Sequence, residues 1–130
     1  MNLKTISAEF SVCKLSGPAD LGNLDMTSGF WFLGKTDQEL SLVCETSSVP
    51  ENTEEREDGF LAFRIEGVLD FSLIGILSNI STVLADHEIG IFAVSTFNTD
   101  YILVKKENYE KALERLADAG YTVIGTKEDE

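Results

Sequence analysis

The sequence predicts an α+β fold, with the order β-α-β-β-α-β over residues 60–125. Two observations lead to this prediction: two apolar stripes at helical spacing lie in the second half of the chain, and strand-like runs flank them. A third observation is that 43% of the 130 residues are apolar, which is enough to bury a core. One domain, or two very small ones, fits this length.

Residues 1–58 are predicted to be mostly β. Strand-like runs cover residues 10–15, 29–33 and 40–44, and the polar segment 34–39 between two of them has room for one helical turn. Gly and Pro residues between positions 16 and 28 interrupt any long helix. The acidic run 51–58 is typical of a solvated linker, so we expect one unit at 1–58 and another at 59–130.

The second unit begins with a strand at 60–65 and a turn at 67–70. A helix of about four turns follows, with Asp70 or Ser72 as its N-cap. Its apolar stripe recurs every three or four residues and consists of Leu73, Ile76, Leu77, Ile80, Val83 and Leu84.

The rest of the second unit is predicted as a hairpin, a helix and a strand. The hairpin joins strands at 91–97 and 101–104 through a two-residue turn at Asn98-Thr99. The second helix ends at Gly120, which suits a residue just past a helix, and a last strand covers 121–124. The stripe of this helix consists of Tyr109, Ala112, Leu113 and Leu116.

This order is the ferredoxin-like one, a four-stranded antiparallel sheet with both helices on one face. Because the strand at 91–97 is apolar on both faces, the opposite face of the sheet also needs a cover. Two covers are equally compatible with the pattern: the first half of the chain, or a partner sheet such as that of a second copy.

The composition excludes several functions. A net charge of −13 and a pI near 4.3 oppose binding to nucleic acid phosphates and to anionic membrane surfaces. Cys13 and Cys44 lie in strand-like runs and are expected to be buried thiols in the reducing cytoplasm. With one histidine and no CxxC motif, no metal-ligand set, cofactor motif or catalytic constellation is visible, so we expect no enzyme activity.

A candidate ligand site does emerge at two places. The start of the first helix, Asp70-Phe71-Ser72-Leu73-Ile74, offers free backbone N–H groups to a carboxylate, and Gly75 could permit close approach. The hairpin residues Thr96, Phe97, Asn98 and Asp100 add polar groups, among which Asp100 can hold an ammonium group. Together these groups suit a free α-amino acid. The alternative is an ordinary capped hairpin, because turns recruit such residues anyway.

The same two segments, Leu69 to Leu77 and Val94 to Val104, resemble a small ACT-domain family. It comprises bacterial tandem-ACT proteins related to the animal CASTOR-type cytosolic arginine sensors. The resemblance is strongest over residues 60–120, and a weaker likeness at 10–15 and 39–44 implies that residues 1–58 are a second, reduced ACT-like unit.

The resemblance implies a regulatory protein that binds an amino acid at an interface between ACT domains, as a cytoplasmic homodimer. It places the ligand against Phe71 to Gly75 and against Thr96, Phe97 and Asp100. The arginine sensors carry an acidic residue where this chain has Leu73, so the ligand implied here is a smaller or apolar amino acid, or none.

Two hypotheses therefore stay open. One is an amino-acid sensor whose ligand state a protein partner reads. The other is a non-catalytic protein–protein interaction module that has kept the fold and lost the ligand. The sequence names neither the amino acid nor the partner, and it leaves open whether the two halves bind ligand within one chain or across a dimer.

Overall fold

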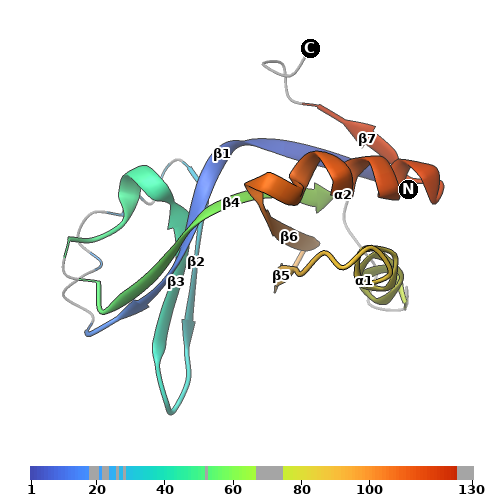
Figure 1. Ribbon diagram of the computed structural model, residues 1–130. Helices are drawn as coiled ribbons and strands as arrows, with labels where there is room; N and C mark the ends of the chain where they lie inside the picture. Colours follow the sequence, from blue (N-terminus) through green and yellow to red (C-terminus); the bar gives the residue numbers. More distant parts are fainter. Residues whose placement is uncertain are drawn as a thin grey trace. The chain divides into compact units, whose positions relative to one another are not determined.

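The computed structural model describes residues 1–17, 21, 24–25, 27, 29–51, 53–66 and 75–125 (Figure 1). The chain divides into two compact units. The N-terminal unit is Ala8–Phe60, and the C-terminal unit is Met1–Ser7 together with Leu61–Glu130. The expected division placed all of residues 1–58 in one unit. In the structure, the first residues of strand β1 (Asn2–Leu15) belong to the C-terminal unit instead.

The N-terminal unit is mostly β, as predicted. It contains β2 (Trp31–Lys35), β3 (Leu40–Glu45), the 3-10 helix η2 (Thr46–Ser48) and the first part of β4 (Glu55–Ile65), with strands in the order β2-β3-β1-β4. The antiparallel register sets Leu15 of β1 opposite Leu40 of β3. The helical turn allowed at 34–39 is absent, because Thr36 N–H donates to Glu39 C=O at 3.0 Å and closes a tight hairpin turn.

The acidic run is only partly a linker, which corrects the prediction for 51–58. Residues 55–58 are exposed and form the start of β4. Their backbone pairs with β1, as the 2.9 Å bond from Glu54 N–H to Lys14 C=O shows at the end of the ladder. Strand pairing uses backbone groups, so charged side chains do not prevent it, and they discourage a further strand from adding at this edge.

The C-terminal unit has the predicted order β-α-β-β-α-β. After β4 come α1 (Ile76–Ala85), β5 (Phe92–Ser95), β6 (Asp100–Lys105), α2 (Lys106–Asp118) and β7 (Thr122–Ile124). Its strands lie in the order β7-β1-β4-β6-β5. The fold is thus the ferredoxin-like one that the sequence predicts, with an additional strand.

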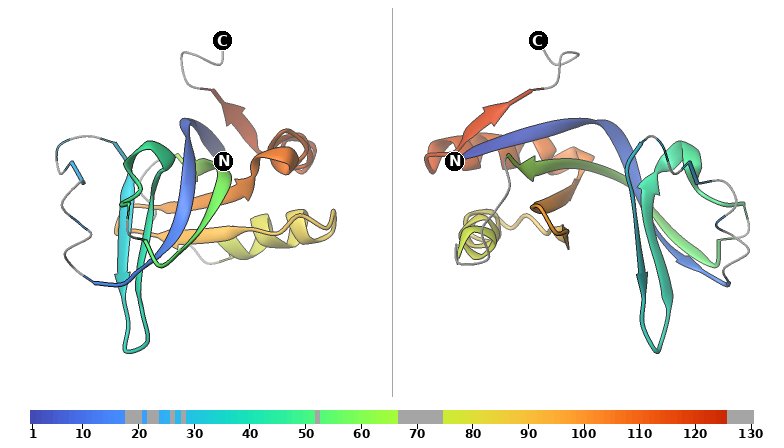
Figure 2. Two further views of the ribbon diagram at one scale, coloured as in Figure 1. Left: turned by 60° about the vertical axis from the view of Figure 1, so that its left-hand side comes forward. Right: turned by 180° about the vertical axis from the view of Figure 1, so that it is seen from behind.

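That additional strand corrects the expected four-stranded antiparallel sheet. β1 takes the place beside β4, and β7 pairs with β1 in parallel, with Asn2 opposite Thr122 and Lys4 opposite Ile124 (Figure 2). β7 has 3 residues and β1 has 14, so β1 offers the longer hydrogen-bonding ladder next to β4. Such a pairing between distant segments leaves no local signal in the sequence.

Both helices cover one face of the sheet, as predicted. Alternate residues of β4 and β6, Phe63 with Ile65 and Ile102 with Val104, share one buried cluster with residues of α1 and α2. The helical members of the cluster are Ile80, Leu84, Ala112 and Leu116, all at stripe positions. Burial of these side chains drives the docking of each helix on the sheet, because each CH₂ group that is buried stabilises the fold by about 0.8 kcal/mol.

The opposite sheet face is also buried at two positions. Ala62 and Leu103, which alternate with the helix-facing residues, are each 1% exposed within the single chain. A second chain is therefore not needed to bury these two side chains.

Candidate functional site

The predicted site residues fall into two groups. Asp70, Phe71, Ser72, Leu73 and Ile74 lie outside the described residues. The other five are described: Gly75 directly precedes α1, and Thr96, Phe97, Asn98 and Asp100 lie on the β5–β6 hairpin.

Gly75 has a different role from the one predicted. It is the N-cap of α1 with φ +85°, so it stands before the helix and not inside it. Among the described residues, no atom lies within 4 Å of a Cβ built at Gly75, and the close approach of a ligand stays a prediction. The left-handed backbone conformation explains the glycine, since residues with a Cβ are strained there. The cap at Gly75 makes no side-chain hydrogen bond, and the caps expected at Asp70 or Ser72 lie outside the described residues.

The hairpin turn is centred one residue earlier than predicted. Thr96 N–H donates to Thr99 C=O at 2.8 Å, so Phe97 and Asn98 are the two loop residues. The Thr96 hydroxyl donates to the same carbonyl at 2.9 Å and accepts from Thr99 N–H at 3.3 Å. Thr96 therefore closes the turn, which is the ordinary capping role that the sequence left open as the alternative.

A residue that the sequence reasoning did not select, Thr99, fixes the hairpin in place. Its side chain is buried, and its hydroxyl donates at 2.8 Å to the carbonyl of Ile65, the last residue of β4. The hairpin turn is thereby held against the end of β4, where the chain enters the segment 67–74. Nothing in the sequence around Thr99 indicates that its hydroxyl bonds to Ile65, which lies 34 positions earlier.

Asp100 is the acidic group of this site. It stands opposite Ser95 in the β5–β6 register, and the Ser95 hydroxyl donates to its Oδ1 at 2.5 Å. This bond orients the carboxylate, which is half-buried. A carboxylate has about four lone-pair positions, so Asp100 can accept further bonds from an ammonium group.

Two side chains at the tip face solvent. Phe97 is 82% exposed, the largest exposure among the large apolar side chains of the described chain, and Asn98 is exposed beside it. Exposing an aromatic ring to water is unfavourable, so a ligand or partner that covers the Phe97 ring would gain free energy.

The cysteines are not part of this site. Cys13 and Cys44 are buried free thiols in the N-terminal unit. Burial raises the pKa of the Cys44 thiol to about 12 and also raises the pKa of Cys13. Both thiols thus stay protonated and poorly nucleophilic at neutral pH. Among the described residues, no three acidic, histidine or cysteine side chains form a cluster that could hold a metal ion.

No helix in the described part of the chain is long and apolar enough to cross a membrane. A search of curated protein sequences finds no match.

Solved structures do match. An Agrobacterium tumefaciens protein is 29% identical, with 96% of this chain and 92% of that chain covered and a TM-score of 0.80. The regulatory subunit of aspartate kinase from Thermus thermophilus is 10% identical, covering 92% of this chain and 97% of that one at a TM-score of 0.62.

The aspartate kinase of Clostridium acetobutylicum is 17% identical, and the match covers 90% of this chain but 33% of the kinase, at a TM-score of 0.64. At these identities, the likeness to the two kinase structures concerns the fold alone.

Residues 55–118 match the ACT domain family. The matched segment contains β4, α1, β5, β6 and α2, and so includes the hairpin and the start of α1 described above. Residues 55–118 of this chain are therefore similar to the ACT domain family.

Proposed function

We propose that this protein is a non-catalytic regulatory protein that senses a free amino acid through the β5–β6 hairpin and the start of α1. The observation that carries the proposal is the bond from the Thr99 hydroxyl to Ile65 C=O, which fixes the hairpin beside the end of β4. Asp100, the next residue along the hairpin, is the proposed acceptor of the ammonium group. The regulatory role named for the Thermus thermophilus relative supports the same class of function.

We further propose a tandem arrangement, in which the N-terminal unit is a reduced ACT-like unit. Its strand order, β2-β3-β1-β4, corresponds position by position to β5-β6-β4-β1 in the C-terminal unit. Its hairpin turn is also built alike: Thr36 N–H donates to Glu39 C=O at 3.0 Å, and Glu39 N–H donates to the Thr36 hydroxyl at 3.1 Å. Thr96 and Thr99 make the same pair of bonds.

The full proposal is a cytoplasmic homodimer that binds its ligand at an interface between ACT domains, as the resemblance to the CASTOR-type sensors implies. Two buried free thiols suit a reducing compartment. Leu73, in the position of the acidic residue of the arginine sensors, favours a small or apolar amino acid.

The alternative function, an interaction module without a ligand, is favoured by one observation. The Thr96 hydroxyl is already used within the turn, while Phe97 is 82% exposed at its tip, where a protein would cover the ring.

Calorimetric titration with single amino acids separates the two functions. For an amino acid that binds, Asp100→Asn should weaken binding roughly tenfold or more, because a charged acceptor of the ammonium group is lost. The control is Asp118→Asn, which makes the same change at an exposed residue of α2. Unchanged affinity in the Asp100 variant would refute the site, and heats that are absent for every amino acid would support the interaction module.

A further inference from the structure

The sheet of the N-terminal unit has two edges, and they differ in how they are protected against pairing with a further strand. Its strands lie in the order β2-β3-β1-β4, so β2 and the first part of β4 form the edges. The edge at β4 begins with four charged residues, 55–58, and such charges discourage further pairing. The edge at β2 carries the uncharged aromatic and aliphatic run 30–33 instead. The edge at β2 therefore lacks the protection that the other edge has.

The backbone of β2 is open on the side away from β3. Thr36 N–H donates to Glu39 C=O at 3.0 Å, and in an antiparallel pair every second residue exchanges such bonds with its partner. Residues 34 and 32 continue this series along the β2–β3 register. The N–H and C=O groups of the alternate residues therefore point to the open side, and these residues are Trp31, Leu33 and Lys35. Among the described residues, no strand lies on that side of β2.

The side chains of β2 suit a neighbouring strand on this side. Successive side chains of a strand point to opposite faces, so Trp31 and Leu33 share one face and Phe32 lies on the other. Leu33 is 41% exposed, while Trp31 and Phe32 are half-buried. A further strand with apolar side chains would cover part of this surface on both faces and remove it from water.

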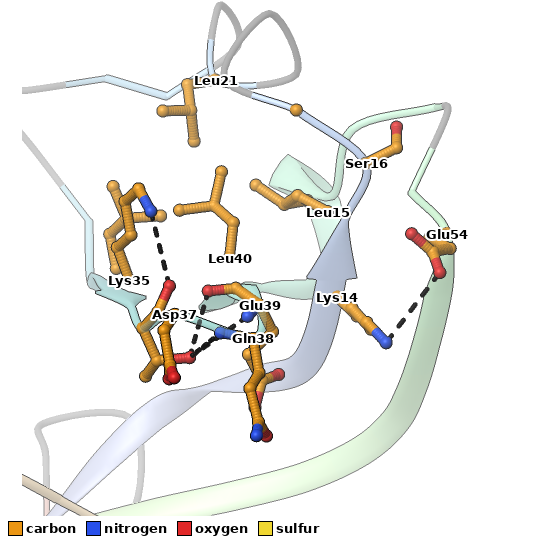
Figure 3. Close-up of a pocket in the computed structure, with 13 residues that line it drawn as sticks. Lys14, Leu15, Ser16, Leu21, Lys35, Asp37, Gln38, Glu39, Leu40 and Glu54 are labelled. Carbon is orange, nitrogen blue, oxygen red and sulfur yellow. Dashed lines mark hydrogen bonds and ion pairs between the residues drawn. The ribbon is translucent and has the colours of Figure 1, made fainter.

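The charge of the N-terminal unit favours a basic partner over a second copy of the chain. Residues 8–60 contain 11 acidic and 3 basic side chains, which gives a net charge of −8. The exposed acids Asp37 and Glu39 lie in the turn that follows β2 (Figure 3), and β2 itself has one base, Lys35. At the other end of β2, Trp31 Nε1 donates to the backbone carbonyl of the exposed Asp25 at 3.2 Å. Two copies paired through β2 would bring acids together, whereas lysine or arginine residues of a partner would form ion pairs with them.

We propose that the open edge of β2 binds an extended, basic segment of another protein, which joins the sheet as a further strand. The outward backbone groups of Trp31, Leu33 and Lys35 hydrogen-bond to this segment, as in other cases of strand addition. Its lysine or arginine residues meet the acids at the two ends of β2. This surface belongs to the N-terminal unit, so the proposal is additional to the amino-acid site on the β5–β6 hairpin and does not depend on it.

The test is an NMR titration of the full chain with synthetic peptides. The first peptide has a core of alternating valine and threonine with a lysine at each end. We expect amide shifts and slower hydrogen exchange at residues 31–35, because their outward groups become hydrogen-bonded. A second peptide has glutamate in place of the lysines, and a third keeps the lysines but has N-methylated amides throughout its core. Each of these two should bind roughly tenfold more weakly or worse, since the ion pairs or the strand hydrogen bonds are lost.

A matched pair of variants locates the contact. Leu33→Lys removes an apolar contact and places a positive charge on the open edge, so it should weaken binding of the basic peptide roughly tenfold. Gln38→Lys adds the same charge in the exposed turn beyond the strand and should weaken binding much less. Because Leu33 is partly exposed, the Leu33→Lys variant should fold normally, which unchanged amide spectra outside β2 would verify.

Three outcomes of the titration would overturn the proposal: no shifts at residues 31–35 with the basic peptide at millimolar concentration, equal binding of either altered peptide, or unchanged binding in Leu33→Lys. Sedimentation velocity provides a fourth. A dimer of the chain that Leu33→Lys dissociates would show that a second copy occupies this edge. Asp100→Asn distinguishes this surface from the hairpin site, because it should leave peptide binding unchanged even if the proposed function is wrong.

Discussion

A single backbone angle decides where α1 begins. Gly75 has φ +85° and open space around it, so its substitution should be governed by backbone strain alone. Adding a Cβ in this region costs about 1–2 kcal/mol, and asparagine tolerates it better than alanine.

We therefore expect Gly75→Ala to lower the free energy of unfolding by about 1 kcal/mol, and Gly75→Asn to lower it by less. The matched control is Gly34→Ala in β2, where there is also open space but no positive φ, and which should be neutral or slightly stabilising. Urea unfolding of the three variants measures the difference. Equal effects at positions 75 and 34 would contradict this explanation of the helix start.

The two buried thiols predict a pH dependence of stability. Burial raises the pKa of Cys44 from 9.0 to about 12, so above pH 9 the unfolded thiol loses its proton while the folded one keeps it. Stability is thus fully present below pH 9 and falls as the pH rises toward 12, at about 1.4 kcal/mol per pH unit for one thiol.

Urea unfolding at pH 8.0, 9.0 and about 9.5 should show this loss. Cys44→Ala should have a lower stability at pH 8 and a shallower decline above pH 9. A decline of the same steepness in that variant would show that other groups cause it.

Among the secondary-structure elements, the β5–β6 hairpin depends on a contact with β4. The buried Thr99 hydroxyl bonds to Ile65 C=O, and its removal leaves a buried carbonyl without that donor. Thr99→Val should cost about 1–3 kcal/mol and lower the melting temperature by about 2–8 °C per kcal/mol. Thr122→Val, at an exposed position of β7, is the control and should cost little. Thr99→Val without loss of stability would refute the anchoring role of this bond.

A second buried hydroxyl connects β1, η2 and β4 in the N-terminal unit. Ser11 is 0% exposed, donates to Asp58 Oδ1 at 2.6 Å and is hydrogen-bonded to the Thr46 hydroxyl at 2.9 Å. Ser11→Ala should lower the free energy of unfolding by about 1–2 kcal/mol, since a charged acceptor loses a donor. Ser7→Ala, at an exposed position of the same strand, should have no effect. Differential scanning calorimetry compares the two, and equal melting temperatures would contradict this role.

The elements themselves were largely predictable, because their signals are local. The stripe from Ile76 to Leu84 predicted α1, Gly120 (φ +105°) marked the end of α2, alternation predicted β3, and the hairpin turn predicted β6 as the returning strand. Helix α1 begins at Ile76, directly after a left-handed glycine that caps it without a side-chain hydrogen bond. Residues 55–58 joined β4 because strand pairing does not require apolar side chains.

At the scale of the whole molecule, the sequence could not reveal how strands are shared. β1 and β4 each contribute to both units, and β7 pairs with the very start of β1. The pairing of β1 with β7 joins residues more than a hundred positions apart, so no short stretch of sequence contains both partners. The same limit applies to the candidate site, where the anchor from Thr99 to Ile65 spans 34 positions and was not foreseen.

The central claim is that the C-terminal unit binds a free amino acid. The most direct measurement is thermal unfolding of the protein and of its Asp100→Asn variant with each common amino acid at millimolar concentration. A ligand at about 100 times its dissociation constant adds roughly 2.7 kcal/mol, which raises the midpoint by several degrees. We predict such a rise for one small or apolar amino acid or a related set, and a smaller rise in the variant. An unchanged midpoint for every amino acid, or an equal rise in the variant, would contradict the claim.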